Sequence, residues 1–226
     1  NLFLKGEHDG YCTCGYGVSE DGTALVANTT YMPGVTSEML DWWFPWHSVG
    51  SDLRYKIWCP TQHYAIHVHE KDYAHRMDQS LSLKERNWGT TDVVYEDVGF
   101  GPQEMHLNFK SPEDYGYDPT LIPNADAIIS AVVTDPKSGH GMVTFSHCIR
   151  RIPGGIEYRS HYWQGMGFDE NGKETVVGTP PGGFQPEVLR DTALHSFLEY
   201  TNLGQILPGL YEKYKDIKDF SKDLLK

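Results

Sequence analysis

Residues 186–207 read PEVLRDTALHSFLEYTNLGQIL, a pattern that is typical of a long helix. Pro186 suits the first turn of a helix, because the N–H that proline lacks would be unsatisfied there anyway. The helical pattern continues until Gly204 or Pro208, and a second, Lys-rich helical stretch follows it. The chain is therefore predicted to end in a helical region over residues 186–226.

One stripe of this helix carries residues at steps of three and four, namely Val188, Thr192, His195, Glu199 and Asn202. Leu194, Leu198 and Leu203 flank the stripe, so the helix is expected to bury it. A buried carboxylate is costly unless it is paired or bound to a metal. His195 and Glu199, four residues apart, can reach one cation at about 2.0–2.2 Å from each donor atom. The alternative is an exposed His–Glu pair that contributes a few tenths of a kcal/mol.

Short β-rich segments precede the helix. Alternating or β-branched residues predict strands at 53–58 (LRYKIW), 91–98, 104–110 and 127–133. Residues 1–40 are rich in Gly and Thr without clear periodicity, and are expected to wrap the domain as loops and short strands. Strands first and a long helix last predict an α+β fold, in which the helix lies across an antiparallel sheet.

The clearest hairpin lies at residues 145–165, around the turn residues Pro153-Gly154-Gly155. If these three residues form the loop, Ile152 faces Ile156 and His147 faces His161. Counting by twos then places one set of side chains on a single face of the sheet: Phe145, His147, Ile149, Arg159, His161 and Trp163. Two histidines would lie side by side on that face.

Length and charge narrow the class of protein. The 226 residues, 39% hydrophobic and 22% charged, suit a single globular domain over residues 1–226. No apolar run approaches the roughly 20 residues that span a bilayer. The formal charge of -12 argues against nucleic acid and against membrane surfaces, because both attract basic faces. A homo-oligomer is compatible with these totals.

The cysteines and aromatic residues add two further indications. Cys12, Cys14, Cys59 and Cys148 are few and irregularly spaced, which predicts reduced thiols in a cytoplasmic protein. The chain also has 11 histidines and 13% aromatic residues. Aromatic walls with a few polar groups are typical of small-molecule pockets, although a core of large side chains gives the same composition.

Five motifs in order resemble the phloretin hydrolase and 2,4-diacetylphloroglucinol hydrolase family. They are DWWFPWH (41–47), RYKIWCPTQH (54–63), VVYEDVGFG (93–101), the hairpin GG-x-EYRSHYWQG (154–165) and HSFLE (195–199). The resemblance implies a helix-grip fold, like that of the birch pollen allergen and START domains, in which a curved antiparallel sheet grips a long C-terminal helix. It also implies hydrolysis of the carbon–carbon bond between a phenolic ring and its acyl group.

The resemblance further implies one metal ion held by two His and two Glu. The matching positions are His63, Glu96, His195 and Glu199. For the two strand ligands, His67 and Asp97 remain alternatives. Zinc is the expected metal, and Fe(II) is the alternative.

The same resemblance places catalytic and substrate-binding residues in a pocket. Tyr55 and His147 are candidates to polarise the acyl carbonyl, and His161, then His147, to protonate the departing ring. His47, Trp46 and Trp163 are candidates to bind the substrate. Tryptophans are more often core than pocket wall, and the neighbours His67 and His69 are expected to face solvent.

The predicted partner is a small phenolic ketone, of the phloretin or acylphloroglucinol type. Two rival functions use the same residues. Two His and a carboxylate also suit a non-haem Fe(II) oxygenase. A helix-grip cavity without chemistry would serve a protein that binds an aromatic or lipid ligand, but such a protein needs no buried HxxxE pair.

Overall fold

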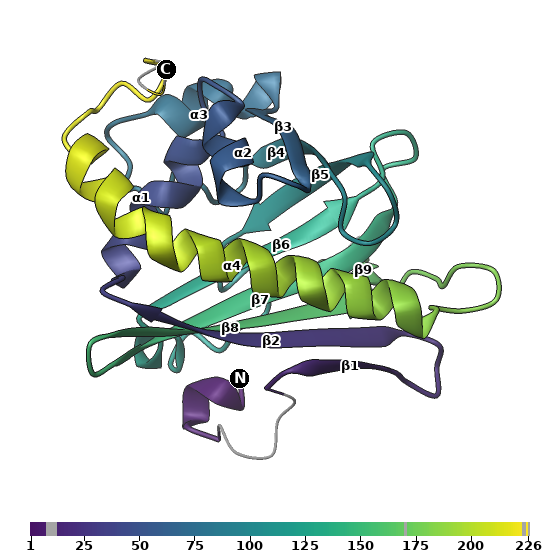
Figure 1. Cartoon of the computed structure of the whole chain (residues 1–226). Helices are drawn as coiled ribbons and strands as arrows, with labels where there is room; N and C mark the ends of the chain where they lie inside the picture. Colours follow the sequence, from purple (N-terminus) through teal and green to yellow (C-terminus); the bar gives the residue numbers. More distant parts are fainter. Residues whose placement is uncertain (8–12, 170, 223–224, 226) are drawn as a thin grey trace.

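Eight antiparallel strands form the main sheet of the protein (Figure 1). The structure, a computed structural model, describes residues 1–7, 13–169, 171–222 and 225. Along the sheet the strands run β1 (Gly15–Val18), β2 (Ala24–Pro33), β8 (Gly155–Gln164), β7 (Gly141–Ile152), β6 (Ala127–Thr134), β5 (Gln103–Lys110), β4 (Thr91–Glu96) and β3 (His63–Val68). The short strands β9 (Met166–Phe168) and β10 (Glu174–Val176) pair separately.

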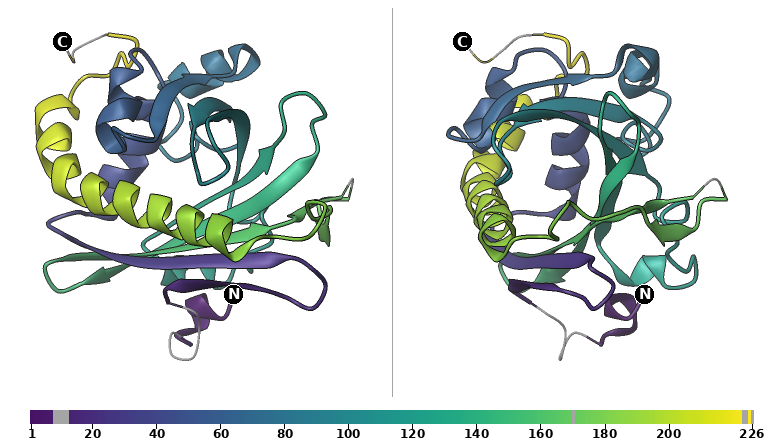
Figure 2. Two further views of the ribbon diagram at one scale, coloured as in Figure 1. Left: turned by 45° about the vertical axis from the view of Figure 1, so that its right-hand side comes forward. Right: turned by 90° about the vertical axis from the view of Figure 1, so that its right-hand side faces the viewer.

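The sheet curves around one long helix, α4 (Pro186–Tyr214), which crosses its concave face (Figures 1 and 2). Shorter helices α1 (Ser37–His47), α2 (Leu53–Trp58) and α3 (Tyr73–Met77) lie at the end where α4 finishes. Three 3-10 turns complete the described elements, at Phe3–Lys5, Glu70–Asp72 and Ile122–Asn124. The predicted α+β, helix-grip fold is confirmed. No helix in the described part of the chain is long and apolar enough to cross a membrane.

Helix α4 is a single helix of 29 residues, so the predicted break at Gly204 or Pro208 is wrong. The predicted second, Lys-rich helix is also wrong, because the described residues after Tyr214 form turns and irregular chain. Gly204 lies against Met32 of β2, where an added Cβ would come within 3.1 Å of Met32 Cγ, so glycine here permits close packing. Pro208 costs about 3 kcal/mol inside a helix. Buried Leu207 and Tyr214 anchor the helix around and beyond it, and such packing contributes most of a helix's stability.

The buried stripe of α4 is confirmed for Thr192, His195 and Glu199. Of its expected flanks, Leu203 is buried, whereas Leu194 and Leu198 are about half exposed, at 51% and 49%. Leu189, Tyr200 and Leu207 supply the other buried apolar side chains of the helix. The helix is therefore rotated so that its polar pair, rather than its leucine pair, faces inward.

Residues 53–58 form helix α2, so their predicted strand is wrong. Six residues of alternation are too few to separate the two periods, and Tyr55 and Trp58 also share one face of a helix. Arg54 is fully buried, where its guanidinium donates hydrogen bonds to the carbonyls of Trp46 and Phe220. These hydrogen bonds stabilise the segment as a helix, and the local sequence pattern does not predict them.

The N-terminal segment is more regular than the loop-rich wrap predicted for residues 1–40. Strand β2 pairs along all ten of its residues with β8, and packs against α4. Residues 8–12, including Cys12, lie outside the described part of the chain. The three described cysteines, Cys14, Cys59 and Cys148, are free thiols, as predicted.

The β7–β8 hairpin has a two-residue loop, Pro153–Gly154, and not the predicted three-residue one. Gly155 already belongs to β8 and pairs with Ile152. Only glycine permits this approach to β2, because an added Cβ would lie 2.2 Å from the Met32 carbonyl oxygen. The register therefore shifts by one residue: His147 pairs with Ser160, and His161 pairs with Ser146. Since directly opposed residues share a face, His147 and His161 lie on opposite faces of the sheet.

Candidate metal centre and active site

A pocket lies between α4 and the concave face of the sheet. Its walls are largely apolar or aromatic, with about 770 Å³ of empty space, part of it open to solvent. The polar lining residues are His47, Tyr55, Asp92, Glu96, His147, Tyr162, Gln164, Thr192, His195, Glu199 and Tyr200. They include no Lys or Arg. This is the composition expected of a small-molecule site.

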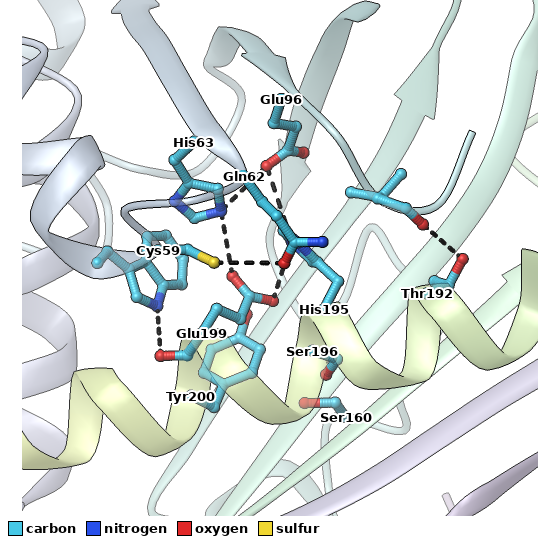
Figure 3. A network of polar contacts seen from close by, with 12 residues as sticks. Cys59, Gln62, His63, Glu96, Ser160, Thr192, His195, Ser196, Glu199 and Tyr200 are labelled. Atoms are coloured by element: carbon cyan, nitrogen blue, oxygen red, sulfur yellow. Dashed lines mark hydrogen bonds and ion pairs between the residues drawn. The ribbon is translucent and has the colours of Figure 1, made fainter. Parts of the chain in front are cut away.

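Four acidic and imidazole side chains converge at one side of this pocket (Figure 3). His63 Nε2 lies 3.2 Å from Glu96 Oε2 and 3.7 Å from Glu199 Oε2. His195 Nε2 lies 3.9 Å from Glu96 Oε2 and 3.8 Å from Glu199 Oε1. All four residues are at least 94% buried. We call His63, Glu96, His195 and Glu199 the His–Glu cluster.

Two different local structures build this cluster. His63 and Glu96 are cross-strand partners at the end of β3 and β4, next to an irregularity in β3. His195 and Glu199 are one helical turn apart on α4, so their side chains lie on the same face. The curved sheet brings the strand pair against the helix pair.

Hydrogen bonds outside the cluster orient both imidazoles. His63 Nδ1 donates a hydrogen bond to the Tyr55 carbonyl at 3.2 Å. In this tautomer Nε2 carries no proton, so its lone pair faces the carboxylates and can bind a metal. That Nε2 is buried and has no hydrogen-bond partner among the described residues. His195 Nδ1 donates to Gln62 Oε1 at 3.2 Å. An imidazole held by its second nitrogen is the usual arrangement around protein-bound metals.

The carboxylates are held in the same way. The Tyr55 hydroxyl donates to Glu96 Oε2, and the Tyr162 hydroxyl donates to Glu199 Oε1 at 3.4 Å. Burial, followed by the charge on Glu96, raises the pKa of Glu199 well above its usual value. Burial also raises the pKa of Glu96, but its contacts with His63, His195 and Tyr55 outweigh this and lower the pKa overall.

The cluster fits a divalent cation. A tetrahedral ion at about 2.1 Å from each donor atom needs neighbouring donors about 3.4 Å apart. The four His–Glu distances, 3.2–3.9 Å, bracket that value. Two carboxylates and two imidazoles also match the N and O ligands that zinc accepts. The orphaned His63 Nε2 and the lack of a cationic side chain in the pocket are both explained by an ion at this place.

Two residues beside the cluster, Cys59 and Gln62, were missed in the sequence. The Cys59 thiol, His63 and His195 form a set whose ligand atoms lie within 4.8 Å of one another, so a metal could also use sulfur. The thiol instead donates to Gln62 Oε1 at 3.5 Å, and burial raises its pKa to about 12. Cys59 is nevertheless a further candidate ligand beside the cluster. Both residues stand just before His63, in CPTQH, and that proximity was the available signal.

The alternative strand ligands lie elsewhere. His67 is exposed near the end of β3, and His69 caps the 3-10 turn that follows the strand. The Asp97 carboxylate accepts hydrogen bonds from the backbone N–H groups of Gly99 and Gly101, at 2.9 and 3.0 Å. It stabilises the turn after β4.

His147 lines the pocket on the sheet side. Its Nδ1 lies 3.0 Å from Ser160 Oγ, and its Nε2 lies 3.0 Å from the Tyr200 hydroxyl. Burial lowers the pKa of His147 to about 3, so its ring is neutral near pH 7. The imidazole therefore sits in a chain of hydroxyl groups that can exchange protons with it.

Three of the predicted pocket residues are outside the pocket. The one-residue register shift places His161 and Trp163 on the outer face of the sheet, where their rings stack at 5.7 Å. Trp46 is fully buried between Trp42 and Tyr214, at ring distances of 4.6 and 5.7 Å, and belongs to the core. His47 and Tyr55, by contrast, do line the pocket.

Comparisons with known proteins agree along most of the chain. The family model described as the DAPG hydrolase PhiG domain matches residues 1–212. Phloretin hydrolase of Eubacterium ramulus is 43% identical over 219 residues, which are 96% of this chain and 77% of that protein. A 2,4-diacetylphloroglucinol hydrolase of a Pseudomonas species is 30% identical over 88% of this chain and 71% of its own. Among solved structures, Ara h 8.0201 matches with a TM-score of 0.49 and 11% identity, over 83% of this chain and 99% of its own.

Proposed function

We propose that this chain, which belongs to the DAPG hydrolase PhiG domain family, hydrolyses the carbon–carbon bond between an acyl group and a polyhydroxylated aromatic ring. The substrate class is that of the relatives' names, a phloretin- or acylphloroglucinol-type ketone. One observation carries the proposal: a buried cluster of two His and two Glu faces an aromatic-walled pocket that has no Lys or Arg in its lining.

We assign His63, Glu96, His195 and Glu199 as ligands of one divalent ion, with zinc as the proposed metal. Such an ion supplies Lewis-acid polarisation of a substrate oxygen and lowers the pKa of nearby water toward about 7. The ion also accounts for the burial of two carboxylates so close together, which would otherwise repel each other. Tyr55 then serves to position Glu96, because its hydroxyl is already donated to that carboxylate.

His147 is the proposed proton carrier. Hydrolysis adds water oxygen to the carbonyl carbon, breaks the bond from that carbon to the ring, and adds a proton to the ring carbon. A neutral imidazole can take the proton that the water loses and deliver it to the ring carbon, so His147 begins and ends the cycle in the same state. Burial lowers its pKa to about 3, so the ring is neutral near pH 7 and one of its nitrogens carries no proton.

Two further tyrosine hydroxyls position the groups around the pocket. Burial raises the pKa of Tyr162 and of Tyr200 well above the usual value, so both stay protonated and act as donors. Tyr162 donates to Glu199, whereas Tyr200 contacts His147. We assign Tyr162 to the positioning of Glu199 and Tyr200 to the orientation of His147.

The test is product analysis with phloretin in the absence of oxygen, using zinc-loaded protein in ¹⁸O-labelled water. We expect the free phloroglucinol ring and the matching carboxylic acid, with one labelled oxygen in the acid. Turnover that requires oxygen would instead identify an oxygenase. Binding without turnover would leave only a ligand-binding protein, and either result would overturn the proposal.

A further inference from the structure

A second polar group lines the same pocket at a distance from the His–Glu cluster. Asp92 is on β4, four residues before Glu96, so both point to the same face of the strand. Their Cα atoms are about 13 Å apart, from a rise of about 3.3 Å per residue. Asp92 is 1% exposed, and its place in the pocket has no part in the chemistry proposed above.

The surroundings of Asp92 leave hydrogen-bonding capacity unused. Arg76 Nη2 lies 3.0 Å from Asp92 Oδ1, which compensates the charge from one side. Arg76 is itself fixed by other contacts, including its Nε donating to the Arg86 carbonyl at 3.0 Å. Ser48 also contacts the carboxylate, but Oδ2 has no partner with good hydrogen-bond geometry among the described residues. A buried carboxylate oxygen without a donor is costly, so a donor is expected to reach it from the pocket.

The wall between the two polar ends is apolar. Val94 lies between Asp92 and Glu96 on the same face of β4, and Ile66, Met105 and Phe109 of the adjoining elements also line the pocket. A ligand that meets both ends must therefore be apolar in the middle and polar at each tip. A ketone whose acyl chain ends in a hydroxylated ring has this shape, whereas an acetyl group is too short to leave the first end.

We propose that Asp92 is a specificity-determining residue that accepts a hydrogen bond from a hydroxyl on the distal ring of a hydroxyaryl-alkanoyl phloroglucinol. Arg76 is the positioning residue that holds the carboxylate in place. This inference rests on the proposed function, since it names which members of the acylphloroglucinol class the site prefers. It selects the long, hydroxyaryl-terminated ketones over short-chain ones.

The experiment compares phloretin with the same ketone lacking the distal hydroxyl, using zinc-loaded wild-type protein and the Asp92→Asn variant. A hydrogen bond to a charged group corresponds to about 10- to 100-fold in kcat/KM. We expect wild-type protein to prefer phloretin by this factor, mainly through KM. Asp92→Asn should lose most of the preference, and should cleave the dehydroxylated ketone almost as well as wild type does.

The outcomes separate the two proposals. Cleavage of both ketones with equal kcat/KM by wild-type protein would overturn the role of Asp92 and leave the hydrolase function standing. A preference that Asp92→Asn retains would do the same. Failure to cleave either ketone would overturn the proposed function and, with it, this inference. Should the variant unfold, equal cleavage of both ketones by the wild-type protein still overturns the role of Asp92.

Discussion

Two buried charged groups lie along the same strand, β4, and they are compensated in opposite ways. Near its start, Asp92 faces the guanidinium of Arg76 at 3.0 Å. At its end, Glu96 shares the His–Glu cluster with Glu199, and no Lys or Arg lines that pocket. The charge of Asp92 is therefore compensated by an arginine of the chain, whereas no cationic side chain of the pocket lining compensates Glu96.

The difference identifies which cluster needs something from outside the chain. Removing one partner of a buried ion pair strands the other charge, at a cost of about 3–5 kcal/mol. The His–Glu cluster is in that condition without an added cation, and burial accordingly raises the pKa of Glu199. Arg76 and Asp92 therefore compensate each other's charge within the chain, whereas the His–Glu cluster is the proposed metal site.

The largest expected effect is at the His–Glu cluster. Glu199→Gln should lose bound zinc and lower kcat/KM on the order of 10³-fold or more, because Lewis-acid stabilisation is worth several kcal/mol. The metal-free variant should be at least as stable as metal-free wild type, because a buried charge is gone. Metal analysis and melting with and without a chelator check both points. Glu104→Gln, at an exposed carboxylate of β5, is the matched control. Full zinc content and wild-type turnover in Glu199→Gln would show that Glu199 is not a metal ligand.

The Arg76–Asp92 pair should respond in the opposite manner. Arg76→Met leaves the Asp92 carboxylate uncompensated and should destabilise the protein by about 3–5 kcal/mol, with or without zinc. Urea unfolding of both forms measures this. Arg190→Met, which breaks an exposed pair with Asp191, should cost no more than about 1 kcal/mol. A loss of zinc from Arg76→Met without loss of stability would contradict the assignment.

The two histidines of the β7–β8 hairpin separate chemistry from metal binding. His147→Ala should keep one zinc per chain but lower kcat by about 10²–10³-fold, since a single proton carrier is lost. His161→Ala, on the outer face of the sheet, should keep both metal and turnover. Steady-state kinetics on phloretin with metal analysis tests the pair. Equal loss of turnover in both variants would argue against the observed register.

His47, the last residue of α1, gives the smallest effect, a change in the pH dependence of stability. Burial, helped by the charge of Arg76, lowers its pKa from 6.5 to about 3. The unfolded chain therefore binds a proton first as the pH falls, so stability is present above pH 6.5 and decreases toward pH 3. His47→Asn should remove about 1.4 kcal/mol per pH unit of this slope.

Urea unfolding of chelator-treated protein at pH 7, 6 and 5 measures the slope. His67→Asn, at an exposed histidine of β3, is the control with the same change of side chain. An unchanged slope in His47→Asn would mean that His47 is protonated in the folded protein.

Local patterns predicted the parts of the site that are local in the chain. His195 and Glu199 are one helical turn apart, so the period of α4 alone puts them together. His63 and Glu96 meet only through the pairing of β3 with β4, and no spacing rule in the sequence distinguishes them from His67 and Asp97. The resemblance to relatives supplied that choice, and the structure brings the same four residues together.

The errors came from contacts with distant residues. The hairpin loop length depends on how closely Gly155 approaches Met32 of β2, which is far away in the chain. A register shift of one residue then placed His161 on the other face of the sheet. Helix α2 depends on Arg54 reaching the carbonyl of Phe220 near the C-terminus. Helix α4 passes Pro208 because its buried face is packed on both sides of the proline. Each of these features requires the assembled fold.

The His–Glu cluster is proposed to hold its metal through nitrogen and oxygen ligands only. X-ray absorption of the zinc-loaded protein measures these ligands. We predict about one zinc per chain with scatterers at about 2.0–2.2 Å, from two imidazoles and two carboxylates. The Cys59→Ser variant should give the same spectrum. A sulfur shell at about 2.3 Å that disappears in Cys59→Ser would place the thiol on the metal and contradict the two-His, two-Glu site.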